Sequence, residues 1–519
     1  MDRDNKNSAR KSFGISRRRF LLTGCAACAG AGLMTAPGIA SAAKKRGKMR
    51  LRVIYVLSAV KQKSRDWPNF GFDFAPEMEK VNNALRNSFP EIEFLPGTAK
   101  GPLQAEKILL QDMFSNIDGY IVDQMNSMNM VVPSIAASGK PVLFSHLQFA
   151  GTGGFLAYNA MLLHSKARNV GFVSSSKTED LIAAVKSFEI VKKGGSTADF
   201  AKAVTQSRKE LTPGPGDLSC APDPLELVSA EECLRRAKES KILAVGYPGV
   251  SLMGVPLIPM EMVSYAQLNA AWRGADKDEA RAVASRWQKS AAAIEEVSED
   301  TLVSCAAMYL GMKSLLKKHK ANAITINCLV GFYGGLIHAY PCLGFHELLN
   351  EGQVGACECD VRSAATMLLV NALTNGRPGY ISDPEIDTGK RSIIYAHCVA
   401  SNRPFGPKGP ANPFQILTHS EDRKGASVRS LLPPGYMTTT LEFMPERRQV
   451  LIHQAKTTGN DPEDRACRTK LVAEPMGDFE KLFTQWDKWG WHRVTVYGDL
   501  KQPVSALAKA MGYKLVQEA

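Results

Sequence analysis

The amino-acid sequence predicts an α/β protein in which two N-terminal domains, each built on a parallel sheet, precede a β-rich C-terminal domain. Strand and helix patterns alternate with short connections from about residue 51 to residue 144. A second alternating series lies between about residues 169 and 320, and longer loops with more strand signals follow it. We therefore divide the chain into residues 43–165, 166–320 and 321–519, after an N-terminal segment of residues 1–42.

Residues 1–42 have the features of an export signal. The arginine run Arg17-Arg18-Arg19 joins a weakly apolar stretch that glycines interrupt, and Ala40-Ser41-Ala42 is a small-x-small cleavage site. Such an order is typical of a twin-arginine signal peptide. We expect the Tat export machinery as a partner and a periplasmic or extracellular location. The alternative interpretation is a basic N-terminal arm with a chance arginine run.

A membrane anchor is not expected. The apolar stretch of the signal is too short and too interrupted for a membrane-spanning helix, and no later segment offers 18 uninterrupted apolar residues. Leu22-Thr23-Gly24-Cys25 is similar to a lipidation motif, but about three apolar residues precede Cys25. A normal apolar region has roughly 7 to 15 residues, so we discount lipidation.

Composition is typical of a soluble globular protein. Apolar residues make up 45% of the chain and charged residues 22%. Without residues 1–42 the 519-residue chain retains 477 residues, which suggests two or three domains. The net charge is +13, and the signal supplies seven Lys or Arg against two Asp, which leaves about +8. No RNA or DNA module accompanies this charge, so we expect no nucleic-acid partner.

The cysteines do not form a disulfide framework. Eleven are present, and removal of Cys25 and Cys28 with the signal leaves nine, an odd number without scaffold spacing. We expect mostly reduced, buried thiols. Cys357-Glu358-Cys359 contains a close pair, but one C-x-C pair without a second pair is a weak zinc signal.

The first α/β domain is expected to have a Rossmann-like parallel sheet. Its predicted strands are 51–57, 92–95, 119–122 and 141–144, and its predicted helices are 75–88 and 103–114. The turn at residues 151–154 lacks the G-x-G-x-x-G order and has no strand directly before it. A dinucleotide site is therefore not expected.

The second α/β domain is expected to begin with a strand near residues 169–173. A helix over 179–193, a strand over 241–246 and a long helical stretch over 264–319 follow. From residue 323 strands such as 393–397, 437–443 and 450–454 alternate with long, proline-rich loops. We expect this last region to form a barrel-like β-domain that holds most of the candidate chemistry.

Acidic and histidine side chains gather in the C-terminal region. In an extended strand Glu358 and Asp360 would project from the same side, which is costly without a cation, a positive partner or water. A salt-bridged or solvated pair is the alternative interpretation. His397 closes one apolar strand, His492 opens another, and Asp383 follows an intervening helix. Histidines at strand ends beside acids are well placed to bind metal or transfer protons.

Several motifs in this region resemble the L-fucose isomerase-like sugar isomerases. They are Gly331-Phe332-Tyr333-Gly334, Tyr340-Pro341-Cys342-Leu343, Leu348-Leu349-Asn350, Ala356-Cys357-Glu358-Cys359-Asp360, Ala396-His397-Cys398 and Gly490-Trp491-His492. The resemblance implies a metal-dependent aldose-ketose isomerase, a manganese cofactor and a homo-oligomer. It covers nearly the whole chain after the signal, but its specific motifs lie in the final third.

The resemblance also implies roles for individual residues. Asp360 and His492 match the family's aspartate and histidine metal ligands, and Glu347 is expected to be the third ligand, although strict alignment places His346 there. The predicted catalytic residues are Glu358, Asp360 and Glu347, because a carboxylate can carry a proton between adjacent sugar carbons through an enediol. The predicted substrate-binding residues are His397, His346, Trp491 and Trp489.

Two other functions fit the same residues. An exported sugar-binding protein could keep the isomerase scaffold without turnover, because fold does not settle function. A metal-dependent epimerase or lyase acting on a sugar derivative would use the same ligands. Metal analysis and an assay with a panel of aldoses distinguish these alternatives.

Overall fold

A five-stranded parallel sheet forms the N-terminal part of the described chain, in the order β2-β1-β3-β4-β5. The computed structural model describes residues 47–126, 128–248 and 255–519, so the predicted signal over 1–42 lies outside the described residues. The strands are β1 (Met49–Val56), β2 (Ile92–Ala99), β3 (Gly119–Gln124), β4 (Val142–His146) and β5 (Val170–Phe172). Helices cover both faces of this sheet. Side chains on both sides of β1, β3 and β4 are therefore buried, and these strands are nearly continuous apolar runs.

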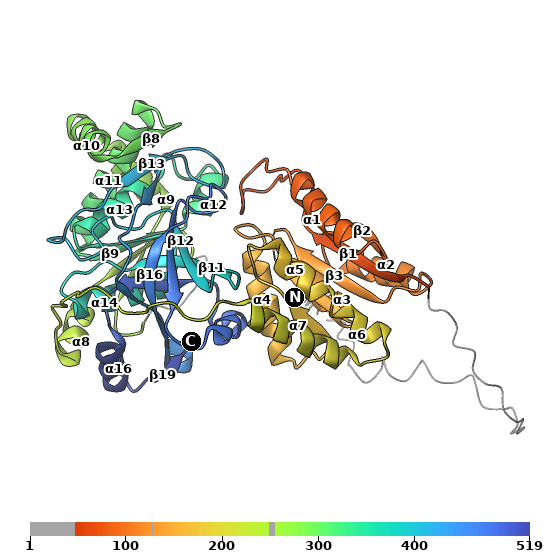
Figure 1. Ribbon diagram of the computed structural model, residues 1–519. Coiled ribbons are helices and arrows are strands. Elements are labelled where there is room, and N and C mark those ends of the chain that lie inside the picture. The colour runs from red at the N-terminus through yellow and green to blue at the C-terminus, as the bar shows by residue number, and fades with distance from the viewer. Residues whose placement is uncertain (1–46, 127, 249–254) are drawn as a thin grey trace, which may run out of the picture. The chain divides into compact units, whose positions relative to one another are not determined.

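The helices of this part form two groups. Helix α5 packs against α1 and α7, whereas α3 packs against α2 and α4 (Figure 1). Their bounds are α1 (Ala75–Ser88), α2 (Pro102–Asp112), α3 (Val131–Ala136), α4 (Thr152–His164), α5 (Thr178–Val185), α6 (Phe188–Lys192) and α7 (Thr197–Leu211). The strand order reverses between β1 and β3, so the sheet has a topological switch point there.

A second parallel sheet has four strands in the order β10-β9-β6-β7. Its strands are β6 (Ile242–Val245), β7 (Met260–Val263), β9 (Ala323–Ile326) and β10 (Val354–Ala356). The helices of this region are α8 (Ala230–Glu239), α9 (Tyr265–Arg273), α10 (Lys277–Ser290), α11 (Glu299–His319), α12 (Cys328–Tyr333), α13 (Cys342–Asn350) and α14 (Val361–Leu373). Within the described ranges, no helix is long and apolar enough to cross a membrane.

The C-terminal strands close into a barrel. The sheet order is β15-β18-β11-β12-β17-β16-β19, and β15 also pairs with β16, so six antiparallel strands form a ring. Strand β19 joins the outside of this ring in parallel with β16. The bounds are β11 (Tyr380–Asp387), β12 (Ser392–His397), β15 (Met437–Met444), β16 (Gln449–Asn460), β17 (Thr469–Pro475), β18 (Arg493–Tyr497) and β19 (Lys514–Gln517).

Short elements complete the fold. A three-stranded sheet in the order β14-β13-β8 joins β8 (Ala293–Glu295), β13 (Phe414–Leu417) and β14 (Ser427–Ser430). The remaining helices are η1 (Pro445–Arg447), η2 (Phe479–Phe483), α15 (Trp486–Trp489) and α16 (Lys501–Ala510). The nine described cysteines are all free, and eight of them are buried, as the absence of scaffold spacing predicts.

The predicted fold class is confirmed, but the sheets run past two of the predicted boundaries. The strand near residue 170 is β5, which forms the edge of the first sheet. The second sheet takes β9 and β10 from beyond residue 320. The division of the chain into domains at residues 165 and 320 stays a prediction, because shared sheets do not by themselves define separate domains.

Two predicted helices are interrupted in the structure. The stretch 264–319 contains α9, α10, β8 and α11, because capping side chains begin new helices inside it. The carboxylate of Asp276 accepts hydrogen bonds from two backbone N–H groups of α10, and the hydroxyl of Ser298 accepts one from α11. The predicted helix 179–193 is likewise divided into α5 and α6.

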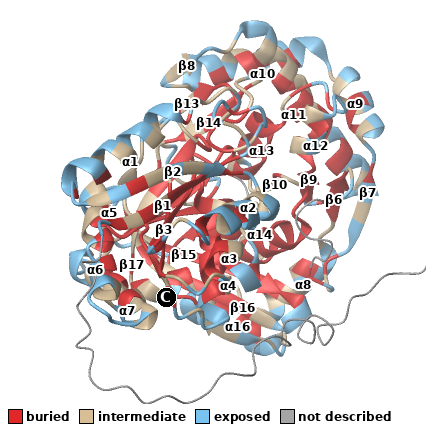
Figure 2. Ribbon diagram, turned by 90° about the vertical axis from the view of Figure 1, so that its right-hand side faces the viewer, coloured by how far each residue is buried: buried red, intermediate tan, exposed pale blue. Residues whose placement is uncertain are grey.

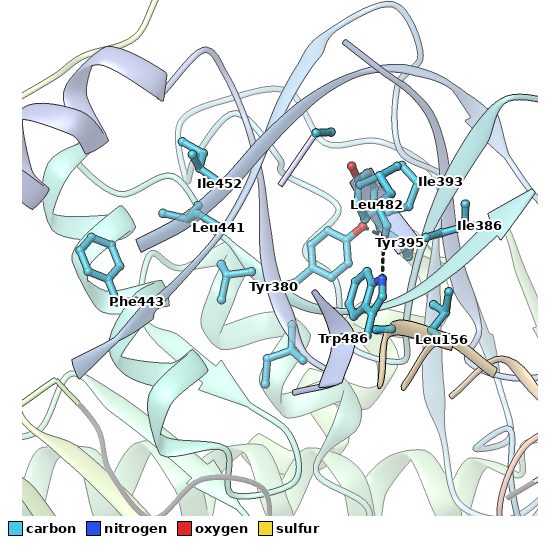
Figure 3. Packing of buried hydrophobic residues seen from close by; sticks show 14 of the residues in the cluster. Leu156, Tyr380, Ile386, Ile393, Tyr395, Leu441, Phe443, Ile452, Leu482 and Trp486 are labelled. Atoms are coloured by element: carbon cyan, nitrogen blue, oxygen red, sulfur yellow. Dashed lines mark hydrogen bonds between the residues drawn. The ribbon is translucent and has the colours of Figure 1, made fainter. Parts of the chain in front are cut away.

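The barrel and the sheets share extensive apolar packing. Figure 2 shows the strands largely buried, while α1, α9 and α10 carry exposed residues on their outer sides. In Figure 3, Tyr380, Ile386 and Tyr395 of the barrel lie near Leu156 of α4 and the indole of Trp486. Hydrophobic burial of this kind supplies most of the folding free energy.

A chain of buried polar groups connects barrel strands with the C-terminal residues. Glu518 accepts hydrogen bonds from His453 Nδ1 at 2.8 Å and from Arg493 Nη2 at 3.0 Å. His453 Nε2 lies 2.8 Å from the hydroxyl of Tyr395. Burial alone would raise the pKa of Glu518, but the Arg493 charge and the His453 hydrogen bond outweigh it and lower that pKa to about 2.

The first prediction concerns the stability of this network. Glu518→Gln leaves Arg493 buried without its counter-charge, so we expect the free energy of unfolding at pH 7 to fall by about 3 kcal/mol. Because the folded-state pKa is lowered, the Glu518 contribution is complete above pH 4.5 and disappears as the pH falls through about 2. The difference between variant and wild type in urea unfolding should therefore shrink over that range.

The matched control is Glu239→Gln, which removes an exposed carboxylate from the surface pair with Arg235. Its urea midpoint should equal that of the wild type. Equal stability of Glu518→Gln and wild type at pH 7 would contradict the assigned role of Glu518.

Candidate metal and catalytic site

Three neighbouring barrel strands bring site residues to one end of the barrel. Strand β11 lies between β18 and β12, with Ser382 paired to Arg493 and Asp383 paired to Ala396. His492 directly precedes β18, and His397 is the last residue of β12. The register therefore places Asp383, His397 and His492 beside one another, although they are far apart in sequence.

Glu358 reaches this end of the barrel from the loop between β10 and α14. Its φ is +61°, and the φ of Cys359 is +49°, so both residues lie in the left-handed region. The strand ends at Ala356, and Asp360 is the N-cap of α14. The predicted extended strand with Glu358 and Asp360 on the same side is therefore wrong, because a tight turn carries both residues.

The imidazole of His492 lies at the centre of the site. Its Nε2 is 3.4 Å from Glu358 Oε2 and 3.3 Å from Asp383 Oδ1, and its Nδ1 is 2.9 Å from Asp360 Oδ2. Glu358, His397 and His492 each offer one ligand atom, and these three atoms lie within 4.8 Å of one another. A single metal ion can bridge such a spacing.

Asp360 has a positioning role in this geometry. Its side chain is fully buried and accepts hydrogen bonds from the backbone N–H groups of Arg362 and Ser363 and from the Ser363 hydroxyl. The contact with His492 Nδ1 uses the remaining capacity of the carboxylate and places a proton on Nδ1, so Nε2 is the nitrogen directed toward Glu358 and Asp383.

The site is electrostatically suited to a divalent cation. Burial alone would lower the pKa of His492, but the carboxylates of Glu358, Asp360 and Asp383 outweigh it and raise that pKa well above its usual value. Burial raises the pKa of Glu358. Asp383 Oδ1 is buried and has no hydrogen-bond partner among the described residues. Carboxylate and imidazole groups turned toward one another need a proton or a metal ion between them.

His397 differs from the other members in its hydrogen bonding. Its Nδ1 accepts a hydrogen bond of 3.0 Å from the backbone N–H of Cys398, which places the proton of the neutral ring on Nε2. This Nε2 is buried and has no partner in the described part of the chain. The tautomer makes His397 a hydrogen-bond donor suited to a substrate oxygen, whereas Glu358 and Asp383 turn carboxylate oxygens toward His492 Nε2.

The structure does not bring Glu347 or His346 into the cluster. Both oxygens of Glu347 are occupied, by Arg286 Nη1 at 2.6 Å and Trp287 Nε1 at 2.9 Å. His346 has Nδ1 at 2.8 Å from the carbonyl oxygen of Ala400 and Nε2 at 3.1 Å from the amide nitrogen of Asn350. Helix α13 uses both side chains for packing and hydrogen bonding, so neither is free for metal.

The two predicted tryptophans lie in different surroundings. Trp491 is half-buried beside His492 and meets the ring of Trp67 edge-on at a centroid distance of 6.0 Å. Trp489 is buried in a small core with Met444 and Leu451. Only Trp491 is therefore placed to contact a molecule bound at the cluster.

Asp383 is the member of the cluster for which the sequence predicts no individual role. It follows a predicted helix, and a single acid in an apolar strand carries no spacing signal. The observation that identifies it is the register of β11 against β18, which places it across from His492.

Comparison with known proteins gives distant relatives. No protein-family model matches the sequence. Proteins named sulfoquinovose isomerase from Priestia aryabhattai and Priestia megaterium are each 23% identical over 221 residues, covering 41% of this chain and 48% of each relative. The one from Alkalicoccus urumqiensis is 29% identical over 147 residues, covering 28% of this chain and 32% of its own. The chain thus matches about half, or less, of the length of these relatives.

A comparison with solved structures adds no functional argument. A structure titled XylFII molecule aligns with 64% of this chain and 96% of its own, at 12% identity and a TM-score of 0.15. Such a score does not support a shared fold. The names of the curated relatives describe sugar isomerases, the class that the sequence motifs resemble.

The second prediction separates ligands from positioning residues. Asp383→Asn should abolish stoichiometric Mn²⁺ binding in isothermal titration calorimetry, because it removes one of the carboxylate charges that face His492 Nε2. Asp360→Asn should weaken Mn²⁺ affinity by roughly 10- to 100-fold, because it changes only the support of His492.

Glu347→Gln is the control for this series and should bind Mn²⁺ like the wild type. If Asp383→Asn keeps wild-type Mn²⁺ affinity and Asp360→Asn loses Mn²⁺ binding completely, the metal ligand is Asp360 rather than Asp383.

Proposed function

We propose that the protein is a metal-dependent sugar isomerase that interconverts an aldose and a ketose through an enediol. The observation that supports this proposal most directly is the cluster of Glu358, Asp383 and His492, with His397 beside it. The names of the distant relatives support the same reaction class. A monosaccharide-like molecule is the proposed substrate, and sulfoquinovose, the sugar in those names, is one compound to assay.

Glu358, Asp383 and His492 are the proposed ligands of Mn²⁺ or another divalent cation. The buried Asp383 Oδ1, which faces His492 Nε2, and the excess of carboxylates fit such an ion. When bound, the ion supplies polarisation of two neighbouring substrate oxygens and stabilises negative charge on them.

Glu358 is the proposed base that carries the proton. Its side chain is 24% exposed, whereas those of Asp383 and His492 are 5% and 2% exposed, so it is the most accessible carboxylate of the cluster. Burial raises its pKa, which strengthens it as a proton acceptor when ionised. A proton leaves one sugar carbon and returns to the adjacent carbon, and a second proton moves from the hydroxyl that becomes the new carbonyl to the oxygen of the former carbonyl.

His397 and Trp491 are proposed to position the sugar. The Nε2–H of His397 can donate to a substrate hydroxyl or carbonyl oxygen. The exposed part of the Trp491 indole offers an apolar face to a sugar ring, and Trp67 and Trp486 hold that indole in place.

The third prediction is catalytic. In a panel of aldoses that includes sulfoquinovose, Mn²⁺-loaded protein should produce a ketose and exchange one carbon-bound hydrogen with D₂O, as followed by NMR. Glu358→Gln should lower kcat by at least about 100-fold, because it removes the base. Glu347→Gln, which changes a carboxylate outside the cluster, should keep wild-type kcat.

The other outcomes distinguish alternative functions. Sugar binding without deuterium exchange would indicate a binding protein on an isomerase scaffold. Exchange at one carbon without a ketose product would indicate an epimerase, and release of a fragment or water a lyase. Full activity of Glu358→Gln would contradict the assigned base.

We also propose that the protein is exported by the Tat route and works in the periplasm or outside the cell as a homo-oligomer. The arginine run and the small-x-small site support export.

The fourth prediction is that replacing Arg17 and Arg18 by Lys retains an uncleaved precursor in the cytoplasm, as seen by fractionation and immunoblotting. Arg10→Lys is the control and should leave export unchanged; equal export of the paired variant would contradict the proposal.

A further inference from the structure

A large cavity lies outside the metal cluster, at the carboxyl ends of the strands of the first sheet. Its volume is about 550 Å³. The wall includes residues that follow β3, β4 and β5, residues of α1, and Lys390 with the segment 461–465 from the C-terminal region. In open parallel sheets, ligands bind at this edge near the topological switch point, and a cavity of this size can hold a small molecule.

Three polar atoms in the wall lack partners. His146 Nδ1, Gln148 Nε2 and Arg465 Nη1 are buried and have no hydrogen-bond partner within the described ranges. His146 ends β4 and Gln148 lies in the loop that follows it, whereas Arg465 comes from a segment more than 300 residues later. Buried polar atoms in native proteins are normally paired, so these lining residues retain hydrogen-bonding capacity that the described part of the chain does not use.

The charges of the lining favour a neutral ligand. The lining has four acidic residues and four cationic ones, so its charges are balanced. The acids are Glu77, Asp123, Asp461 and Glu463, and the cations are Lys80, Lys177, Lys390 and Arg465. His146 is neutral, because burial lowers its pKa to about 3. Hydroxyls of Ser145, Ser175, Ser176 and Thr178 complete the wall. A polyhydroxylated molecule matches such a lining, because each of its hydroxyls can both donate and accept a hydrogen bond.

The cavity is separate from the metal cluster. Lys390 lies in the turn between β11 and β12, whereas Asp383 and His397 lie at the other end of the same two strands. Asp387, at the turn end of β11, and Asp383 are four residues apart, which is about 13 Å at about 3.3 Å per residue of strand. The lining shares no residue with Glu358, Asp383, His397 or His492.

We propose that this cavity is a second binding site, which takes a neutral monosaccharide or a similar polyol. Its ligand would contact the turn of the hairpin whose far end carries Asp383 and His397. Ser174, between β5 and the cavity loop, donates its hydroxyl hydrogen to the carbonyl of Ile386, and its backbone carbonyl accepts a hydrogen bond from the N–H of Thr388. The lining residue Ser176 donates its backbone N–H to Asp387 Oδ1, so the wall of the cavity is also bonded directly to that hairpin.

The fifth prediction tests binding in a protein whose metal cluster is disabled. In the Asp383→Asn, His492→Ala double variant, saturation-transfer NMR and calorimetry with neutral aldohexoses and ketohexoses should detect one bound sugar per chain. Gln148→Leu in this background should weaken the binding about 5- to 10-fold, because it removes one unpaired donor.

Occlusion of the cavity provides the matched comparison. Ser176→Trp places a bulky group on an exposed lining residue and keeps the backbone hydrogen bond from Ser176 to Asp387, so sugar binding should fall more than 10-fold. Glu179→Trp adds the same group to an exposed position outside the lining and should bind like the parent. Thermal unfolding of each variant confirms that it is folded.

Any one of three results would overturn the proposal that the cavity binds a neutral sugar. No sugar binding in the folded double variant, or equal binding with and without Ser176→Trp, shows that the cavity is not a sugar site. Binding of inorganic phosphate in place of neutral sugars shows that the ligand class is wrong. Because the metal cluster is disabled throughout, none of these outcomes depends on whether the isomerase proposal is correct.

Discussion

The buried carboxylate of Asp360 holds the candidate site together. It caps α14 through two backbone N–H groups and orients His492, which directly precedes a barrel strand. One side chain thus connects the turn that carries Glu358 with the strand that follows His492. Without this interaction, the helix would lose its N-cap and the imidazole would lose the hydrogen bond that assigns its proton to Nδ1. The directions of Glu358 and His492 depend on the same few atoms.

Closure of the barrel is the second constraint. Strand β15 pairs with both β16 and β18, so β11, β12 and β18 have neighbours on both sides, and their relative register is fixed. That register places Asp383 and His492 side by side and leaves His397 at the adjacent strand end. The hairpin β11–β12 has the metal cluster at one end and the proposed sugar cavity at the other. A rigid two-stranded element therefore lies between two polar sites that share no residue.

The site residues differ in how well the sequence could identify them. Glu358, His397 and His492 were predicted from strand ends and family motifs, and the structure brings them within metal-binding distance of one another. Glu347 and His346 lie on a helix whose apolar pattern is clear, but sequence cannot show that Arg286, Trp287 and the Ala400 carbonyl use their polar atoms. Asp383 could not be assigned, because its partner lies more than 100 residues away and only strand pairing brings them together.

The sequence by itself determined the succession of parallel α/β regions and a β-rich C-terminal region, because hydrophobic period and turn chemistry are local properties. It also determined which residue types were available for metal and proton chemistry. Tertiary structure decided that α10 and α11 are separate helices, that both parallel sheets extend past the predicted limits, and that Asp360 supports His492 while Asp383 faces it. Those outcomes depend on contacts between distant segments, which hydrophobic period does not encode.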